Sequence, residues 1–452
     1  MTPSVAATTL PGSPAVRRRD RPLGQAAPET STRVVDRGGR LAGVGYRPGD
    51  AAYRRVTVAL FAAGVTTFAL LYSPQAVLPE LAEDFGMPVS ATTLSISVTT
   101  LAMAVALLAV GPVTERVGRT PIIRASVVVT SVVGIAHSLA PNWPTLLVLR
   151  GLQGISLAGM AAVAMAYLRE EIAPDAHAGA TGLYVGGTAI GGMVGRLIVG
   201  AVADAAGWRW ALAAMGGVGL VCAVVVVVTL PPSRGFRRTE PSRAARRATM
   251  RRLVTDPALL ALYGVAAVAM GAFIAVFNTV GFRLRGEPYA LGVAAASLVY
   301  LAYAPGSLTS TYAGRLADRV GRRPVLPVAF GALAIGLAVT AAAPLWIFLV
   351  GLVVFSGAFF AVHGLASGWV VARAQFGGGG IGQASAFYLV AYYGGSSLFG
   401  GLAGPAWAGG GWPAVLALTG SLAVIGLGLA WWLTRIPALV DPPAEDPGVA
   451  AY

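Results

Sequence analysis

The sequence predicts an all-α polytopic membrane protein with twelve transmembrane helices in two six-helix pseudo-repeats. Composition is the first reason: 56% of the 452 residues are hydrophobic and 12% are charged, whereas soluble domains are about 45–50% apolar and about 25% charged. The second is a series of twelve apolar stretches, each close to the ~20 residues that a helix needs to cross a bilayer. The third is a set of motifs that recurs 203 positions later in the chain.

Short polar turns separate the apolar stretches, and one longer charged segment follows the sixth. We expect spans at 55–78, 91–112, 121–140, 143–168, 178–203, 208–230, 257–281, 291–313, 324–343, 344–372, 380–404 and 412–434. They define an N-terminal half at 51–230, an Arg-rich linker at 231–256 and a C-terminal half at 257–436. Residues 1–50, rich in Pro, Arg, Ser and Thr, are expected to form a disordered N-tail, and 437–452 a short C-tail.

The arginines indicate the orientation of the spans. All 33 basic residues are Arg, and with the N-terminus inside, 28 of them fall on the cytoplasmic side. Only Arg209, Arg283 and Arg285 fall outside. This bias predicts a multi-pass protein of the bacterial plasma membrane with both termini cytoplasmic. It also accounts for the net charge of +14 without nucleic acid, because the arginines face anionic lipid headgroups.

The reactive residue types are scarce. The chain has one cysteine, three histidines and no lysine, which excludes a Cys-based metal site, a paired-His zinc site and a phosphate-binding Gly-Lys loop. We therefore expect no metal, no cofactor and no catalytic residue, and transport driven by an ion gradient. A polytopic membrane enzyme or sensor is the alternative from another class. It would need an acid–base cluster or an extra soluble domain, and the sequence shows neither.

A charged turn occurs once in each half. "GPVTERVGRTP" begins at Gly111 and "GRLADRVGRRP" at Gly314. The turn residues that correspond, in order, are Gly111, Glu115, Arg116, Gly118 and Arg119 in the first copy and Gly314, Asp318, Arg319, Gly321 and Arg322 in the second. We expect Gly111 and Gly314 to allow tight helix ends and close approach, and the arginines to hold each turn at the cytoplasmic face.

At these residues the chain resembles the major facilitator superfamily, over roughly residues 52–436. "GRLADRVGRRP" is very close to the superfamily's signature turn between helices 2 and 3, repeated between helices 8 and 9. "RGLQG" from Arg150 looks like its helix-4 motif. "GLYVGGTAIGGMVGR" from Gly182 is similar to the antiporter-type helix-5 motif, with Gly187-Thr188 in place of its Gly-Pro pair. "AMAYLREE" and "YLVAYYGGSS" are similar to efflux permeases called YnfM-like or arabinose-efflux-permease-like.

The resemblance implies a role for the acids of the charged turns. In the superfamily this acid faces the N-terminal end of a helix from the other half when the cytoplasmic side is closed. The partners here would be 380–385 for Glu115 and 178–181 for Asp318. A carboxylate at a helix N-terminus gains about 0.3–1 kcal/mol, so such a latch could open in each cycle. The alternative is that the turns only determine topology.

Two arginines lie within predicted spans, Arg150 in the fourth and Arg196 in the fifth. An unpaired arginine there costs about 2.5–3.5 kcal/mol on insertion scales. The structural interpretation is a salt bridge with Glu80, Asp84 or Asp204 together with backbone carbonyl contacts. The functional interpretation is binding of a substrate anion or coupling to protonation, and the resemblance favours coupling for Arg150.

Further candidates lie on helices that would line a central pathway. His363 could carry a coupled proton, because imidazole titrates near neutral pH, or it could be a packing residue, as we expect of His137. The polar candidates for the pathway are Gln75, Gln153, Asn278 and Tyr388, with Tyr72 and Tyr392 beside them.

Small residues and prolines shape the predicted helices. Gly187, Gly191 and Gly195 form a repeated small-xxx-small face, which we expect to pack closely at the interface between the halves. Pro74 and Pro305 are expected to kink the first and eighth spans.

These features predict a secondary transporter that moves a small molecule by rocking its two halves, acting as a monomer. Proton-coupled efflux is the leading hypothesis. A neutral or anionic compound is expected, because the pathway has two arginines and no mid-span acid to meet a cation. A proton symporter that imports a small metabolite or anion is the main alternative.

Overall fold

The chain divides into Met1–Gly43 and a compact unit from Val44 to Tyr452. Within that unit the computed structural model describes residues 45–234 and 243–436. Most of the predicted N-tail, the predicted C-tail and residues 235–242 of the linker lie outside the described residues.

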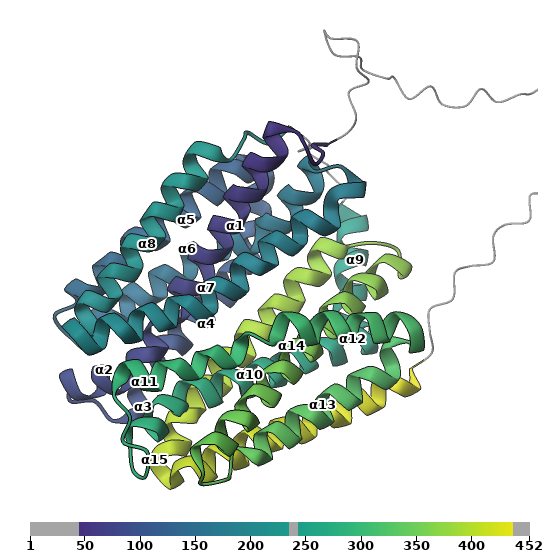
Figure 1. The fold of residues 1–452 in the computed structure, drawn as a ribbon. Coiled ribbons are helices and arrows are strands. Elements are labelled where there is room, and N and C mark those ends of the chain that lie inside the picture. The colour runs from purple at the N-terminus through teal and green to yellow at the C-terminus, as the bar shows by residue number, and fades with distance from the viewer. Residues whose placement is uncertain (1–44, 235–242, 437–452) are drawn as a thin grey trace, which may run out of the picture. The chain divides into compact units, whose positions relative to one another are not determined.

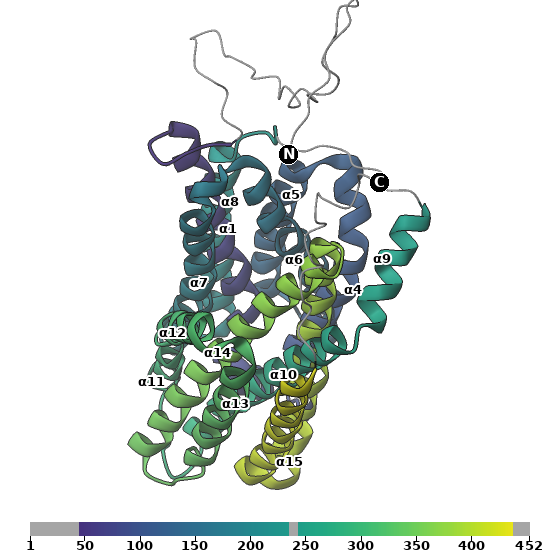
Figure 2. The ribbon, with the colours of Figure 1, turned by 90° about the vertical axis from the view of Figure 1, so that its right-hand side faces the viewer.

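The described residues form two groups of helices. The first half comprises α1 (Ala51–Tyr72), α2 (Leu78–Asp84), α3 (Val89–Thr92), α4 (Leu94–Val117), α5 (Arg119–Ala136), α6 (Trp143–Glu171), α7 (His177–Ala206) and α8 (Trp208–Thr229). The second half comprises α10 (Pro257–Arg285), α11 (Val293–Ser297), α12 (Gly306–Val320), α13 (Arg322–Val339), α14 (Leu345–Phe376) and α15 (Ile381–Arg435). The first half is purple to teal and the second green to yellow in Figure 1, and Figure 2 shows the same two groups from another side.

The twelve predicted spans all have helical counterparts, although two differ from the prediction. Ten helical stretches of the described chain are long and apolar enough to cross a membrane. The last of them, Ile381–Arg435, contains two predicted spans, because Gly410 and Gly411 have non-helical backbone angles. The predicted eighth span is not continuous: it is divided into α11, a 3₁₀ helix at Leu298–Tyr303 and α12. Pro305 lies at the last of these breaks, since it has no N–H for a helical hydrogen bond.

The linker also contains a helix that the sequence did not suggest. α9 (Arg243–Thr255) is helical within the predicted Arg-rich segment, and Arg252 donates a hydrogen bond to the carbonyl of Gly379 at 2.5 Å. The linker is therefore attached to the loop that precedes α15.

The internal repeat is visible in the backbone. Gly118 ends α4 with φ +94°, and Gly321, 203 positions later, ends α12 with φ +86°. Gly207 and Gly411 have φ +83° and +59° after their spans. Glycine is favoured at these four positions because side chains disfavour positive φ. The shared conformations show that the two halves are built alike.

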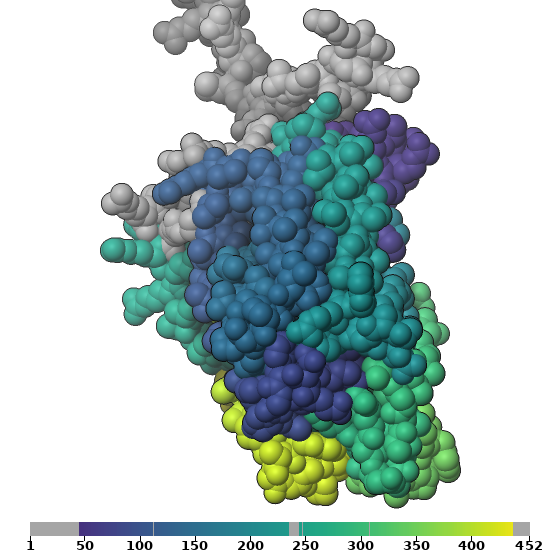
Figure 3. Space-filling model, turned by 90° about the vertical axis from the view of Figure 1, so that its left-hand side faces the viewer, coloured from purple at the N-terminus to yellow at the C-terminus, as the bar shows by residue number. Residues whose placement is uncertain are grey.

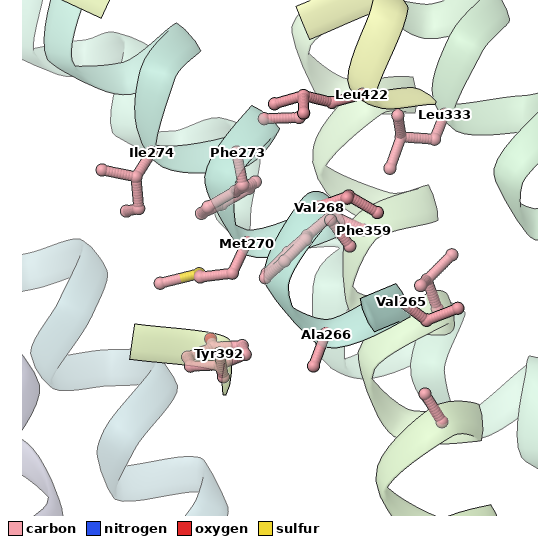
Figure 4. Packing of buried hydrophobic residues seen from close by; sticks show 14 of the residues in the cluster. Val265, Ala266, Val268, Met270, Phe273, Ile274, Leu333, Phe359, Tyr392 and Leu422 are labelled. Carbon is pink, nitrogen blue, oxygen red and sulfur yellow. The ribbon is translucent and has the colours of Figure 1, made fainter. Parts of the chain in front are cut away.

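The stretch from α1 to α2 and helix α10 are the most buried spans, at 78% and 83% of their apolar windows. They occupy equivalent positions in the two halves. Around α10 the core is aromatic: the rings of Phe273 and Phe359 stack at 3.9 Å, and Leu333, Tyr392 and other apolar side chains surround them (Figure 4). Figure 3 shows a face formed mostly by the first half, with the green and yellow second half visible below and at the lower right.

Candidate functional site

A chain of buried polar side chains crosses from one half to the other. Arg196 on α7 donates from Nε to Oε1 of Gln75 at 2.8 Å. Gln75 donates from Nε2 to Oδ1 of Asn278 on α10 at 2.7 Å. Asn278 donates from Nδ2 to the carbonyl of Gly400 on α15 at 3.1 Å. The three side chains are each 1% exposed, so the chain is shielded from solvent.

The chemistry of its two ends determines the direction of this chain. A guanidinium can only donate and a backbone carbonyl can only accept, so each amide must present oxygen toward Arg196 and nitrogen toward Gly400. Gln75 and Asn278 are separated by 203 positions, the offset of the repeat. Equivalent residues of the two halves therefore meet each other at the interface.

Arg196 is surrounded by aromatic rings in addition to these hydrogen bonds. Its guanidinium carbon lies 4.7 Å from the ring centre of Tyr72, 5.0 Å from that of Tyr300 and 5.0 Å from that of Tyr303, and Nη1 donates to the carbonyl of Gly192. Such contacts attract a cation to the ring face. We call Arg196, Tyr72, Tyr300 and Tyr303 the Arg196 cage. The two tyrosines at 300 and 303 were not predicted; their one-turn spacing in a predicted span was the available signal.

Arg150 has a different environment, made of carbonyl groups. Its guanidinium donates to the backbone oxygens of Ser95 at 2.9 Å, Leu70 at 3.2 Å and Leu71 at 2.6 Å, and to Oε1 of Gln153. Leu70 is four residues before Pro74, which has no N–H to offer its carbonyl. Arg150 thus satisfies acceptors where α1 changes into the 3₁₀ helix Ser73–Val77. This is the carbonyl arrangement of the structural interpretation.

The acids expected near these arginines have other partners. Glu80 pairs with Arg285 of the second half, and Asp84 pairs with Arg209 at 2.7 Å. Asp204 accepts a 3.4 Å bond from the backbone N–H of Ala294. Neither Arg150 nor Arg196 forms an ion pair with a carboxylate among the described residues. The salt bridges considered for them are therefore not present.

His363 lies in the aromatic core of the second half. Its Nδ1 is 2.9 Å from the hydroxyl of Tyr388, and its ring centre is 4.8 Å from that of Tyr392. The residue is partly exposed. His137 is 1% exposed, and its Nε2 has no hydrogen-bond partner in the described part of the chain.

The two charged turns lie at the end of the bundle opposite α2, which we call the turn end. Each lines a hollow within its own half: one of about 400 Å³ includes Arg116, Gly118 and Arg119, and one of about 550 Å³ includes Asp318, Gly321 and Arg322. Arg319 is exposed beside the second hollow. Arg119 also pairs with Glu170 at 2.9 Å.

The predicted glycines of the turns differ from the residues that end the helices. Gly111 and Gly314 lie inside α4 and α12, with nothing within 4 Å of where a side chain would begin. The helices end instead at Gly118 and Gly321, where φ is positive. In this structure Gly111 and Gly314 make no close approach to another helix.

The glycine face of α7 packs closely, but against a different partner from the one expected. A Cβ at Gly187 would lie 2.5 Å from the carbonyl oxygen of Phe61, at Gly191 2.3 Å from that of Val65, and at Gly195 2.8 Å from Cβ of Ala69. All three contacts are with α1 of the same half. The expectation of an interface between halves is wrong here, because helix rotation cannot be obtained from spacing alone.

The halves are joined at the end that contains α2, α3 and α11, which we call the closed end. Thr93 donates to the carbonyl of Gly401 at 3.3 Å and Ser397 to that of Ser97 at 2.8 Å, near the Glu80–Arg285 pair. At the turn end, Gly182 and Gly186 near the start of α7 and Gly382 near the start of α15 face open space. Asp318 is exposed and forms no hydrogen bond or ion pair with a described residue.

Known proteins share these features of sequence and fold. The sequence profile of the Major Facilitator Superfamily matches residues 58–308. The chain is 39% identical to the inner membrane transport protein YnfM of Escherichia coli, over 84% of this chain and 90% of that protein. It is 35% identical to the MFS-type transporter YybF of Bacillus subtilis, over 87% and 97%. The crystal structure of a D-xylose-proton symporter has the same fold, with a TM-score of 0.69 at 14% identity over 87% of this chain and 99% of that chain.

Proposed function

Because this integral membrane protein belongs to the major facilitator superfamily, we propose that it exports a neutral or anionic small molecule across the bacterial plasma membrane in exchange for protons. The observation that carries the proposal is the distribution of contacts between the halves. Polar contacts join them at the closed end, while at the turn end Gly182 and Gly186 of α7 and Gly382 of α15 have no atom of the described chain within 4 Å of where a side chain would begin. Rocking of the two halves would break the contacts at the closed end and bring the halves together at the turn end, which is alternating access.

The proposed orientation places both termini and the turn end in the cytoplasm. The arginine distribution supports it, because 28 of 33 arginines then lie inside. A reporter fused after Arg247 should be cytoplasmic and one placed near Arg285 external. The reverse result would contradict the orientation and the direction of transport together.

Proton coupling is assigned to His363. The described membrane spans contain no carboxylate beside Arg150 or Arg196, whereas His363 is partly exposed and bonded to Tyr388. An imidazole can gain and lose a proton near neutral pH. Arg150, whose donors are occupied by carbonyls, then stabilises the break in α1.

The experiment begins with a deletion strain, in which compound tolerance and exported metabolites identify the cargo. Flux of that cargo is then measured in proteoliposomes with an imposed pH gradient. We expect protonophore-sensitive uphill transport that His363→Gln abolishes while downhill exchange persists. Transport that a protonophore does not affect, or strong saturable transport of a quaternary ammonium compound, would overturn the proposal. A proton symporter that imports its cargo would show the opposite gradient requirement.

A further inference from the structure

The Arg196 cage contains more hydrogen-bond donors than acceptors. Nε and Nη1 of Arg196 have acceptors in Gln75 and Gly192, while Nη2 bonds to no described residue. The hydroxyl group of Tyr303 is buried without a hydrogen-bond partner, and that of Tyr72 has the hydroxyl of Ser396 beside it; the two tyrosines are 8% and 2% exposed. Leaving a buried polar group unpaired is energetically costly. The cage therefore keeps one guanidinium nitrogen and the Tyr303 hydroxyl without a partner among the described residues.

This surplus distinguishes Arg196 from the other buried arginine. Arg150 is 0% exposed, and each of its three nitrogens donates to a carbonyl or amide oxygen. An arginine with a purely structural role thus receives acceptors from the protein in this fold. At Arg196 only Nε and Nη1 receive acceptors from the protein, and the other neighbours are aromatic rings, which leaves Nη2 for a partner from outside the chain.

The neighbours of the cage indicate what else that partner would contain. Phe277 lies edge-on to Tyr303, with ring centres 4.7 Å apart, and 5.8 Å from Tyr300. Phe273 lies 5.0 Å from Tyr303. Beyond the cation the surroundings are aromatic, and they suit an apolar or aromatic body rather than a sugar or a polyanion.

We propose that Arg196, Tyr72 and Tyr303 bind the carboxylate of an anionic solute that has an apolar or aromatic body. Arg196 supplies the charge and Nη2, and the two phenols donate to the carboxylate oxygens. Charge-assisted hydrogen bonds of this kind are about twice as strong as neutral ones. This proposal rests on the transport function above and narrows its cargo to monocarboxylates.

The position of the cage links binding to the movement of the halves. Tyr72 and Arg196 belong to the first half, and Tyr300 and Tyr303 to the second. Separation of the halves at the closed end would move Tyr300 and Tyr303 away and expose the guanidinium. The carboxylate would then bind between the halves and be enclosed when they meet.

The test compares carboxylates with their neutral amides. Purified protein in lipid nanodiscs is titrated with benzoate, benzamide, hexanoate and hexanamide up to about 10 mM, and the shift of the unfolding midpoint gives the apparent affinity. We expect benzoate and hexanoate to stabilise the protein and the amides to have little effect. Arg196→Gln should weaken benzoate binding about tenfold or more, and Tyr303→Phe, which keeps the ring, about three- to tenfold.

Two further variants keep the test decisive. Arg196→Lys keeps the charge and shows whether the protein folds if Arg196→Gln does not. Tyr167→Phe removes a phenol on α6 that donates to the carbonyl of Pro231, at the start of the linker, at 2.8 Å. Tyr167 is not part of the cage, so this variant should bind benzoate as the wild type does. Equal responses to benzoate and benzamide, or a benzoate response that Arg196→Gln and Tyr303→Phe leave unchanged, would overturn the site.

The test separates this site from the proposed function. Carboxylate binding with this mutational pattern, together with no flux of any cargo in proteoliposomes, would support the site and refute the transport proposal. Proton-driven flux without a preference for carboxylates would refute the site and leave the transport proposal intact.

Discussion

The two halves have the same order of spans but stabilise their first helices differently. α1 ends at Tyr72, before Pro74, whereas α10 continues unbroken from Pro257 to Arg285, with Phe277 at the position equivalent to Pro74. Arg150 satisfies the carbonyls near the break in α1, and its equivalent in the second half is Val353. The break in the first helix is therefore accompanied by a donor that the second half, with its continuous α10, does not carry.

The same comparison applies to the polar chain between the halves. Gln75 and Asn278 occupy equivalent positions and bond to each other. Gln75 is joined to α7 through the side chain of Arg196, whereas Asn278 is joined to α15 through the carbonyl of Gly400. One half contributes a charge and the other a backbone acceptor. In this polar chain the asymmetry between the halves lies in the groups at its two ends.

The largest effect on stability is expected when Arg150 is replaced by valine, the residue at the equivalent position of the second half. Arg150→Val would leave the carbonyls of Leu70 and Leu71 without their donor, at about 1–3 kcal/mol each, so stability should fall by roughly 3 kcal/mol or more. Arg150→Lys should recover only part of the loss, because an ammonium lacks the planar fork of a guanidinium. Thermal unfolding in nanodiscs measures the change.

Two controls distinguish this role from proton coupling. Val353→Ala, at the equivalent and exposed position of the second half, should change stability little. Pro74→Ala restores a backbone N–H for Leu70 and should recover about 1 kcal/mol in the Arg150→Val background. If Arg150→Val folds with wild-type stability and loses only gradient-driven accumulation, Arg150 is a coupling residue and the structural role is refuted.

A smaller effect, similar in the two halves, is expected at equivalent glycines. A Cβ at Gly191 would lie 2.3 Å from the carbonyl of Val65, and at Gly395 2.1 Å from that of Ala267. Gly191→Ala and Gly395→Ala should each cost about 1–3 kcal/mol through overpacking. Gly186→Ala and Gly394→Ala are matched controls, because nothing lies within 4 Å of them. A large difference between the two test variants would show that the halves are not packed alike.

Removing the hydrogen bond between Gln75 and Asn278 should shift the equilibrium between the states with the closed end shut and open by about 1 kcal/mol. Gln75→Leu, Asn278→Leu and the double variant form a cycle whose coupling should be about 0.5–1.5 kcal/mol, or roughly a two- to twelvefold change in population. Spin labels on Glu83→Cys and Ala341→Cys, in a Cys222→Ser background, would report separation of the halves at the closed end.

The exchanged pair, Gln75→Asn with Asn278→Gln, is the control for the cycle. It keeps the order of donors and acceptors that Arg196 and the Gly400 carbonyl impose, so it should separate less than either leucine variant. Additive single effects in the cycle would mean that the two amides do not act as a pair.

The fold class could be predicted from the sequence because hydropathy and the internal repeat are properties of long segments. Each of the twelve predicted spans has a helical counterpart, and ten helical stretches of the described chain are long and apolar enough to cross a membrane. The kinks predicted at Pro74 and Pro305 coincide with helix breaks, because proline removes a specific hydrogen bond. The sequence could not show that the helix of the eighth span is divided into three pieces, since an apolar segment has the same composition whether its helix is intact or broken.

The site was predictable only as a set of separate residues. Arg150, Arg196, Gln75 and Asn278 are conspicuous because polar residues are rare in apolar spans. Their pairing depends on helix rotation and on which helices adjoin, and neither follows from spacing. For that reason the prediction of what the Gly187, Gly191 and Gly195 face packs against was wrong. Tyr300 and Tyr303 were not predicted because tyrosine is common in such spans.

The smallest effect is expected at the charged turns, where the halves again carry equivalent residues. Glu115 and Asp318 are both exposed in this structure. Glu115→Gln and Asp318→Asn should leave folding and insertion intact. Transport should fall about two- to fivefold, because each acid adds about 0.3–1 kcal/mol when it meets the start of a helix from the other half, and labelling of the pathway from the cytoplasm should rise.

The control for the latches is Glu83→Gln, which neutralises an exposed acid at the closed end and should alter neither flux nor labelling. Because the two latches would act on different helices, 380–385 and 178–181, their free-energy effects should add in the double variant. Additivity would establish two independent latches of similar strength. Normal transport in both single variants and in the double variant would instead show that the turns serve only to fix the topology of each half, where the arginines at 116 and 319 are sufficient.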